Sequence, residues 1–199
     1  MLGYDFENAL KREGYSLVCG MDEAGRGPLA GRVYAAAVIL PDGLVIDGLN
    51  DSKKLSEKKR EALYDIILRE AISCGIAYAE PAEIDEINIL NASMLAMRRA
   101  AALLDPVPDA GIVDGNISRG FPFHTVTLIK GDSLSPSVAA ASILAKVSRD
   151  RYMKELALRY PAYHFEQHKG YPTEAHRRIL REIGPCPEHR RSFLAFLSR

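Results

Sequence analysis

Short apolar runs separated by links rich in glycine and proline dominate the first forty residues. Residues 16–22 read SLVCGMD and residues 32–40 read RVYAAAVIL, and EAGRGPLAG lies between them. Runs of this length between turn-forming residues are typical of buried strands. Because the connection is short, we predict that the two strands pair in antiparallel fashion.

A helical pattern follows in residues 51–74, which begin DSKKLSEKKREAL. Ser56 can cap this helix and Gly75 is expected to end it. One face of the helix carries the apolar residues Leu63, Ile66, Ile67 and Ala71. Next, IAYAE at 76–80 predicts a strand, and residues 81–104 predict one or two helices.

The second half of the chain continues this alternation. Residues 111–114 and 125–132 are two short apolar runs that predict strands, and residues 135–160 form the strongest predicted helix. Ser135 can cap that helix and Pro136 suits its first position. A stretch of aromatic, basic and glycine residues then precedes one more short helix. The order predicts an α/β protein, in which a leading hairpin is followed by strands alternating with helices around one core.

The amino-acid composition mainly excludes several classes of protein. The 199 residues are 47% hydrophobic and 26% charged with zero formal net charge, which is typical of a soluble globular domain. The three cysteines are far apart and lack CxxC spacing, so a disulfide framework or zinc ribbon is not expected. This cysteine usage favours a reducing compartment. No run approaches the roughly 20 apolar residues that span a bilayer. The polar N-terminus lacks a signal-peptide pattern, so we expect a cytoplasmic protein without membrane association.

The charge is unevenly distributed along the chain. From Tyr160 onward there are seven Lys or Arg against four Asp or Glu, together with four of the five histidines. A locally basic face can bind nucleic acid without a basic whole.

Acidic residues finish three of the predicted strands: Asp22 followed by Glu23, Asp114 in VDGN, and Asp132 in IKGD. Ligands of open α/β sheets bind beyond the carboxyl ends of strands. Neighbouring residues of a strand point to opposite faces, so Asp22 and Glu23 reach one site only at a strand end or a bulge. Carboxylates without nearby His or Cys favour Mg²⁺ or Mn²⁺. Two such ions about 3.5–4 Å apart form a clamp for displacement at phosphorus.

Taken together, several motifs resemble the bacterial type 2 ribonuclease H family, ribonuclease HII. The matching stretches follow the family order over almost the whole chain, and they are GMDEAGRGPLAG, NDSKKLSEKKRE, VDGN, IKGDSLSPSVAAASILAKVSRDRYM, YPAYHFEQHKGYPTEAH and HRRSF. The resemblance implies a ribonuclease H-like fold over residues 1–199 as a single domain. That fold has a mixed central sheet flanked by helices and a small C-terminal helical segment. Residues from about 160 are expected to contribute to substrate binding.

The resemblance also implies an activity. A divalent-metal endonuclease is expected to cut the RNA strand of RNA–DNA hybrids, or 5′ of ribonucleotides embedded in duplex DNA, leaving a 5′-phosphate and a 3′-hydroxyl. The resemblance implies that the four carboxylates named above bind two ions, Mg²⁺ or Mn²⁺. By position, the loop that reads the ribose falls on Gly25, Arg26 and Gly27, and a stacking tyrosine falls on Tyr171. Backbone amides and carbonyls of the glycine loop could bond the 2′-hydroxyl at close range.

Further substrate contacts are predicted at Lys53, before the first long helix, and at Ser142 and Lys146, which share a face of the later one. Lys54 is a possible second phosphate contact, and Arg26 could grip a phosphate or form a surface ion pair. Asp150 could be a fifth acid near the metals, but because arginines flank it, we favour a structural ion pair. The remaining polar candidates are His164, His168 and His176. We expect these histidines either to contact phosphate or RNA or simply to be exposed.

Two alternatives stay open from the sequence. One is a metal-dependent DNA nuclease of the integrase or resolvase kind, and the other is a non-catalytic nucleic-acid binder with a structural ion. No obligate protein partner and no clamp-binding tail is evident, and a monomer is expected. The longer C-terminal extension of some relatives does not follow HRRSF, from which we expect weaker substrate binding.

Overall fold

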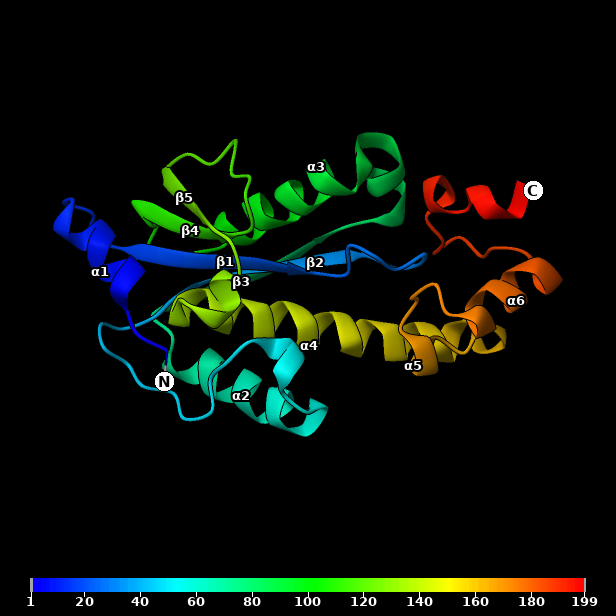
Figure 1. Cartoon of the computed structure of the whole chain (residues 1–199), viewed down its shortest axis with the longest axis horizontal. Coiled ribbons are helices and arrows are strands. Elements are labelled where there is room, and N and C mark those ends of the chain that lie inside the picture. Colours follow the sequence, from blue (N-terminus) through cyan, green and yellow to red (C-terminus); the bar gives the residue numbers. More distant parts are fainter. Residues whose placement is uncertain (1, 199) are drawn as a thin grey trace.

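A five-stranded mixed sheet forms the centre of the protein in a computed structural model, which describes residues 2–198 (Figure 1). The strands lie in the order β3-β2-β1-β4-β5. Their bounds are β1 Val18–Ala24, β2 Val33–Ile39, β3 Ser73–Ala79, β4 Ala110–Asp114 and β5 His124–Leu128.

Strand β2 runs opposite to the other four strands. The pairs β1–β2 and β2–β3 are antiparallel, which confirms the predicted hairpin, whereas β1–β4 and β4–β5 are parallel. The carboxyl ends of β1 and β4 are therefore neighbours at one edge of the sheet. Ligand sites of α/β sheets form at such edges.

Helices cover both faces of the sheet (Figure 1). They are α1 Asp5–Arg12, α2 Glu57–Glu70, α3 Pro81–Ala101, α4 Pro136–Arg159, α5 Phe165–His168 and α6 Glu174–Ile183, with short 3₁₀ turns η1 Ser52–Lys54, η2 Gly131–Ser133, η3 Pro161–Tyr163, η4 Arg191–Phe193 and η5 Ala195–Ser198. Strand β2 shows why two layers form. Its Ala35 and Ala37 pack with α3, whereas Ala36 and Val38 pack with α2 and α4, as the two-residue period of a strand requires. The fold is the predicted α/β class, and the small helices after α4 agree with the expected C-terminal helical segment.

The predicted caps are present. The hydroxyls of Ser56 and Ser135 accept hydrogen bonds from the first turns of α2 and α4. Helix α1 was not predicted, and it supplies the buried Glu7, which accepts from the hydroxyls of Ser135 at 2.5 Å and Ser137 at 2.6 Å. A carboxylate at the N-terminus of α4 complements the helix dipole.

Two predicted boundaries are wrong. Gly75 does not end α2, which stops at Glu70, and it lies inside β3 instead. A Cβ at this position would lie 2.0 Å from the carbonyl oxygen of Ala100, so glycine allows α3 to pack closely on the sheet. Strand β5 ends at Leu128, and Asp132 lies in η2 rather than at a strand end, after Lys130 in the left-handed region (φ 59°).

The expectation for the histidines is also wrong for two of them. His168 and His176 are buried, with their rings stacked at a centroid distance of 4.1 Å, while His164 is exposed as expected. His176 Nε2 lies 3.0 Å from Nε2 of His189, which is buried as well. The rings form part of the core between α4 and the C-terminal segment. Within residues 2–198, no helix has the length and apolar character needed to cross a membrane.

Acidification is expected to destabilise the fold through this histidine pair. Burial lowers the pKa of His176 and of His189 to about 4, from 6.5. Between these values the unfolded chain binds protons that the folded chain does not, so stability is intact above pH 6.5 and falls toward pH 4. Urea denaturation at pH 7.5 and 5.0 should show a loss of roughly 2 kcal/mol for one such histidine. A His189→Asn variant should lose less over the same interval. Equal pH dependence in both proteins would contradict this assignment.

Candidate active site

A polar cavity of about 260 Å³ opens where β1 ends. It brings together residues that are far apart in the sequence, from β1, the turn after it, η1, β4, α4 and the loop before α6. The lining residues are Asp22, Glu23, Ala24, Gly25, Arg26, Gly27, Ser52, Lys53, Asp114, Ser142, Lys146 and Tyr171. Of the predicted site residues, only Asp132 is missing from this lining, and it contacts the cavity through Lys53.

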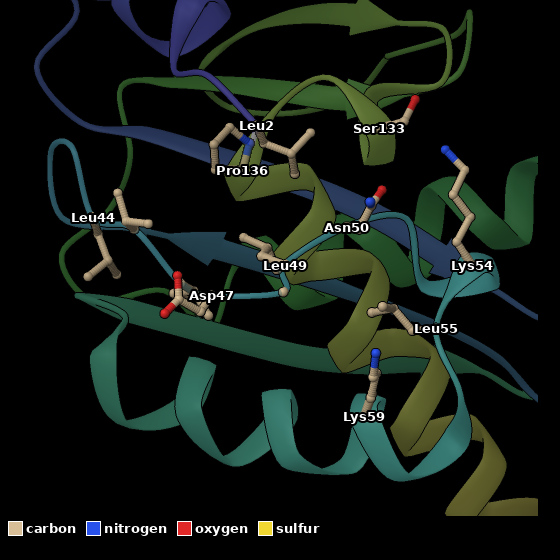
Figure 2. Close-up of a pocket in the computed structure, with 13 residues that line it drawn as sticks. Leu2, Leu44, Asp47, Leu49, Asn50, Lys54, Leu55, Lys59, Ser133 and Pro136 are labelled. Atoms are coloured by element: carbon tan, nitrogen blue, oxygen red, sulfur yellow. The ribbon is translucent and has the colours of Figure 1, made fainter.

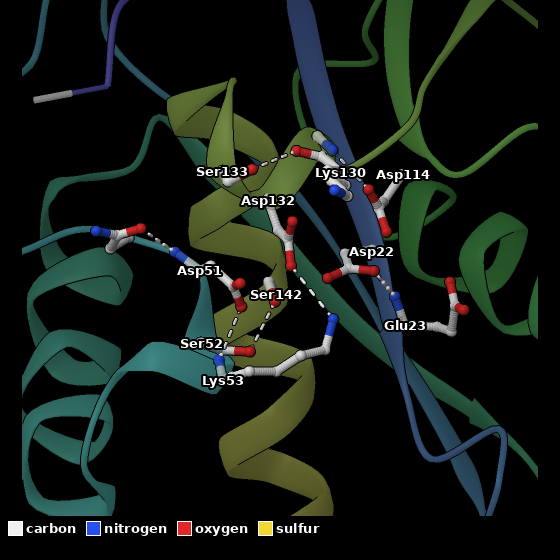
Figure 3. A network of polar contacts seen from close by, with 12 residues as sticks. Asp22, Glu23, Asp51, Ser52, Lys53, Asp114, Lys130, Asp132, Ser133 and Ser142 are labelled. Carbon is white, nitrogen blue, oxygen red and sulfur yellow. Dashed lines mark hydrogen bonds and ion pairs between the residues drawn. The ribbon is translucent and has the colours of Figure 1, made fainter.

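Three aspartates converge at this cavity from three elements: β1, β4 and η2. Asp22, Asp114 and Asp132 point toward one another, whereas the Glu23 side chain leaves β1 on the other side (Figure 3). Because Glu23 is the second-last residue of β1, it still lines the cavity, as expected for adjacent acids near a strand end. Asp114 Oδ1 accepts from the Gly131 amide at 2.7 Å, which fixes η2 and hence Asp132 beside β4.

Burial and mutual repulsion disfavour the charged forms of the acids in this cavity. Burial, followed by the charges of Glu23 and Asp114, raises the pKa of Asp22 well above its usual range. Burial is also the main reason that the pKa values of Glu23 and Asp132 are raised, although Arg26 and Lys53 respectively oppose this effect. Such mutual repulsion in a buried place calls for a counter-cation.

The residues fit divalent metal ions in donor chemistry and in charge. All four predicted ligands carry oxygen donors of the type that Mg²⁺ and Mn²⁺ prefer. Their excess negative charge, seen in the raised pKa of Asp22, is what bound cations would relieve. Within residues 2–198, however, no three His, Cys, Asp or Glu side chains form a ready cage.

Lys53 already supplies part of the positive charge. Its Nζ lies 3.4 Å from Asp132 Oδ2, and its side chain is 77% exposed. Beside it, the Ser52 hydroxyl lies 2.9 Å from that of Ser142. Ser142 is 3% exposed, so contact of its hydroxyl with a DNA strand, which stays a prediction, would require this bond to open.

The glycine loop and Tyr171 line the same cavity. Arg26 is exposed and its Nη1 lies 3.3 Å from Glu23 Oε1, which is the surface ion pair considered from the sequence. The Arg26 side chain is 52% exposed whereas that of Glu23 is 11% exposed, so the guanidinium can reach a substrate from the solvent side of this pair. The Tyr171 ring is 42% exposed and faces the position where a Cβ of Gly27 would lie, at 3.7 Å. The loop and the ring are thus adjacent.

Lys146 lies on α4 at the edge of the cavity. Its Nζ lies 2.7 Å from Oδ1 of the buried Asp150, and Arg60 lies 3.7 Å from Oδ2 of the same carboxylate. The ion pair expected for Asp150 is present, although its partners are Lys146 and Arg60 rather than the flanking arginines. Lys146 remains a predicted substrate contact, now with Asp150 as its anchor.

A larger hollow of about 690 Å³ lies beside the 44–50 loop (Figure 2). Its walls combine leucine side chains with polar groups that include Asn50, Lys54 and Lys59, and Asp47 is the one acid among its lining residues. It therefore lacks the cluster of carboxylates that defines the smaller cavity.

Two buried arginines behind the glycine loop were missed by the sequence analysis. Arg149 and Arg190 are both 0% exposed. Arg149 Nη2 donates to the carbonyl of Lys169 at 3.0 Å, close to Tyr171. HRRSF contributed to the resemblance, but nothing in its local pattern indicated that Arg190 would be buried.

Comparison with known proteins agrees with this picture. The family described as ribonuclease HII matches residues 19–196. The ribonuclease HII of Caldicellulosiruptor saccharolyticus is 50% identical over 98% of this chain and 96% of its own length. The crystal structure of ribonuclease H2 from Pyrococcus horikoshii has a TM-score of 0.76 at 26% identity, covering 92% of this chain and 98% of that one. The RNase HII of Archaeoglobus fulgidus, solved in a complex with PCNA, has a TM-score of 0.70 at 26% identity, covering 88% and 94%.

A mixed sheet with this topology and these structural neighbours defines a nuclease of the ribonuclease H class, a phosphodiester hydrolase with the ribonuclease H-like fold. The full-length match to the family makes the assignment narrower. The chain belongs to the ribonuclease HII family.

Proposed function

We propose that the chain cuts the RNA strand of RNA–DNA hybrids and cuts 5′ of ribonucleotides embedded in duplex DNA, leaving a 5′-phosphate and a 3′-hydroxyl. Its role would be removal of ribonucleotides from DNA. One observation carries the proposal: Asp22 and Asp114 line the same cavity as the Gly25–Gly27 loop, and Asp132 points toward these two aspartates. The acids suit phosphodiester hydrolysis and the glycine loop suits close contact with a sugar.

Each part of the cavity has a task under this proposal. Two Mg²⁺ or Mn²⁺ ions, when bound, supply an activated water and charge stabilisation of the leaving 3′-oxygen. The carboxylates of Asp22, Glu23, Asp114 and Asp132 would hold them. Lys53, which is 77% exposed, can leave Asp132 and bind a backbone phosphate when the cations arrive.

The glycine loop and Tyr171 would select the sugar and orient the strand. Gly27 is exposed and has no Cβ, so a ribose can approach the backbone closely. The exposed Tyr171 ring can stack on a sugar or base beside it. Lys146 and Ser142 would contact the DNA strand. Residues 1–199 would work as one catalytic domain and as a monomer without an obligate protein partner, with the part from about 160 contributing Tyr171.

The decisive test is a DNA duplex that carries one ribonucleotide. With Mg²⁺ we expect a cut on the 5′ side of the ribonucleotide, no cut in the all-deoxy duplex, and no cut with excess EDTA, since the carboxylates then lack their cations. Products would be resolved on a denaturing gel beside size markers that end in 3′-hydroxyl. Equal cleavage of both duplexes would favour a DNA nuclease, and binding without any cleavage would favour a non-catalytic binder.

A further inference from the structure

The buried side chain of Arg190 is hydrogen-bonded to the backbone of the glycine loop and of the residues that follow it. Its guanidinium donates to four carbonyls: Nη2 to Gly25 at 2.6 Å, Nη1 to Arg26 at 3.0 Å and to Pro28 at 2.8 Å, and Nε to Gly31 at 2.9 Å. The forked shape of a guanidinium allows one side chain to hold several acceptors in fixed directions.

The charge of Arg190 is buried without a carboxylate. Among residues 2–198, no Asp or Glu lies within ion-pair distance of it. Burial lowers its pKa to about 9, which still leaves it charged at neutral pH. The carbonyl dipoles of the loop therefore solvate this charge in place of water, and removing it would leave four inward-facing carbonyls without their donor.

The position of Arg190 is itself fixed by neighbouring backbone. Its amide donates to the Leu29 carbonyl at 2.8 Å, and the Gly31 amide donates to the Glu188 carbonyl at 2.8 Å. The Leu29 amide in turn donates to the Gly170 carbonyl at 2.8 Å, next to Tyr171. The loop, the Tyr171 segment and residues 186–190 are thus one hydrogen-bonded unit.

Peptide geometry links these contacts to the cavity. In a trans peptide the carbonyl and the following amide point in opposite directions. Because the carbonyls of Gly25 and Arg26 face the buried guanidinium, the amides of Arg26 and Gly27 face away from it, on the exposed side of the loop. No acceptor within residues 2–198 takes either amide.

We propose that Arg190 is a positioning residue, which keeps the amides of Arg26 and Gly27 turned outward as paired donors to the ribose 2′-oxygen. The inference rests on the proposed function, since the ribose is the feature that these amides would read. It also narrows the sequence-based expectation. The carbonyls of Gly25 and Arg26 are held inward by Arg190, so these two peptide units face the substrate with their amides.

Arg190→Lys tests this role. Lysine keeps the charge but lacks the fork, so the two peptide planes lose their fixed direction. The measurement is the dissociation constant for a duplex with one ribonucleotide and for the same duplex in all-deoxy form, with Ca²⁺ replacing Mg²⁺ to prevent cleavage. We expect the wild type to prefer the ribonucleotide, and Arg190→Lys to lose that preference by about tenfold, the effect of one to two hydrogen bonds.

Leu180→Ala provides the matched control. Leu180 is buried on α6 in the apolar cluster that also contains Leu29 and Leu194, so its truncation lowers stability, but it leaves the four hydrogen bonds of Arg190 to the loop carbonyls in place. Binding of both duplexes should fall together in this variant, and their ratio should stay at the wild-type value. Arg190→Gln, which is neutral and shorter, is the second variant. Circular dichroism at the assay temperature selects whichever Arg190 variant is folded.

The outcomes separate the two proposals. Wild-type protein that neither cleaves nor prefers the ribonucleotide duplex would overturn the proposed function. Wild-type preference that a folded Arg190 variant retains in full would overturn the positioning role alone. Loss of preference to the same extent in Leu180→Ala would also overturn it, because general destabilisation would then explain the effect.

Discussion

Replacing Asp22 with asparagine is expected to lower kcat by roughly 10³-fold, a loss typical of removing a group that stabilises developing charge. The same variant should be more stable than the wild type in metal-free buffer. Asp22 is 4% exposed and its charge is opposed by burial and by Glu23 and Asp114, so a neutral isostere relieves that repulsion. The amide oxygen of asparagine can still accept from the Glu23 amide, which lies 2.7 Å from Asp22 Oδ1.

Thermal denaturation with and without Mg²⁺ distinguishes this from a simple loss of function. Mg²⁺ should raise the melting temperature of the wild type more than that of Asp22→Asn. Bound cations relieve the repulsion between carboxylates in the wild type, and the substitution has already reduced that repulsion in the variant. Glu83→Gln is the control, since Glu83 pairs with Arg99 on α3, away from the cavity. It should leave kcat unchanged. Retention of kcat within tenfold, or a loss of stability in metal-free buffer, would argue against a metal-binding role for Asp22.

Local signals predicted much of the fold. The apolar runs of β1 and β2 and the capped helices α2 and α4 carry their pattern within a few residues, so periodicity and a cap suffice to find them. Gly75 shows where this reasoning fails. A glycine after a helical pattern predicts a helix stop, but the role of Gly75 is set by the carbonyl of Ala100, which packs against the sheet at this position, and no local pattern contains that contact.

The candidate site divides in the same way. Residue chemistry and the resemblance placed Asp22, Asp114 and Asp132 together, and the fold brings them to one cavity edge. The support behind the glycine loop was not predictable, because Arg190 reaches that loop only after residues 186–190 pair with residues 29–31. Burial of His176 and His189 has the same origin. Each depends on a contact between segments far apart in the sequence.

Gly25 and Gly27 differ in a way that separates folding from substrate recognition. Gly25 has φ of +103°, and a Cβ there would lie 2.2 Å from Arg149 Nε and 2.5 Å from its Cδ. Gly25→Ala should therefore destabilise the protein by several kcal/mol, as expected for backbone strain combined with overpacking. Gly27 is exposed, and the nearest heavy atom to its Cβ would be Tyr171 Cε1 at an ordinary 3.7 Å.

Gly27→Ala is consequently expected to fold with an unchanged melting temperature while KM for the ribonucleotide duplex rises at least about tenfold. The added methyl group occupies the space through which a sugar must approach the backbone, and it leaves the carboxylates untouched. Steady-state kinetics on the one-ribonucleotide duplex, with a melting curve for each protein, measures both quantities. Gly43→Ala is the matched glycine control in a surface loop. A Cβ at Gly43 would meet no atom within 4 Å, so the only cost of this substitution is the backbone strain of an alanine at φ +69°. It should cost some stability and leave KM unchanged. If Gly27→Ala binds and cleaves like the wild type, close approach of a sugar to this glycine is excluded, and recognition of the ribose must be sought on the Tyr171 side of the cavity.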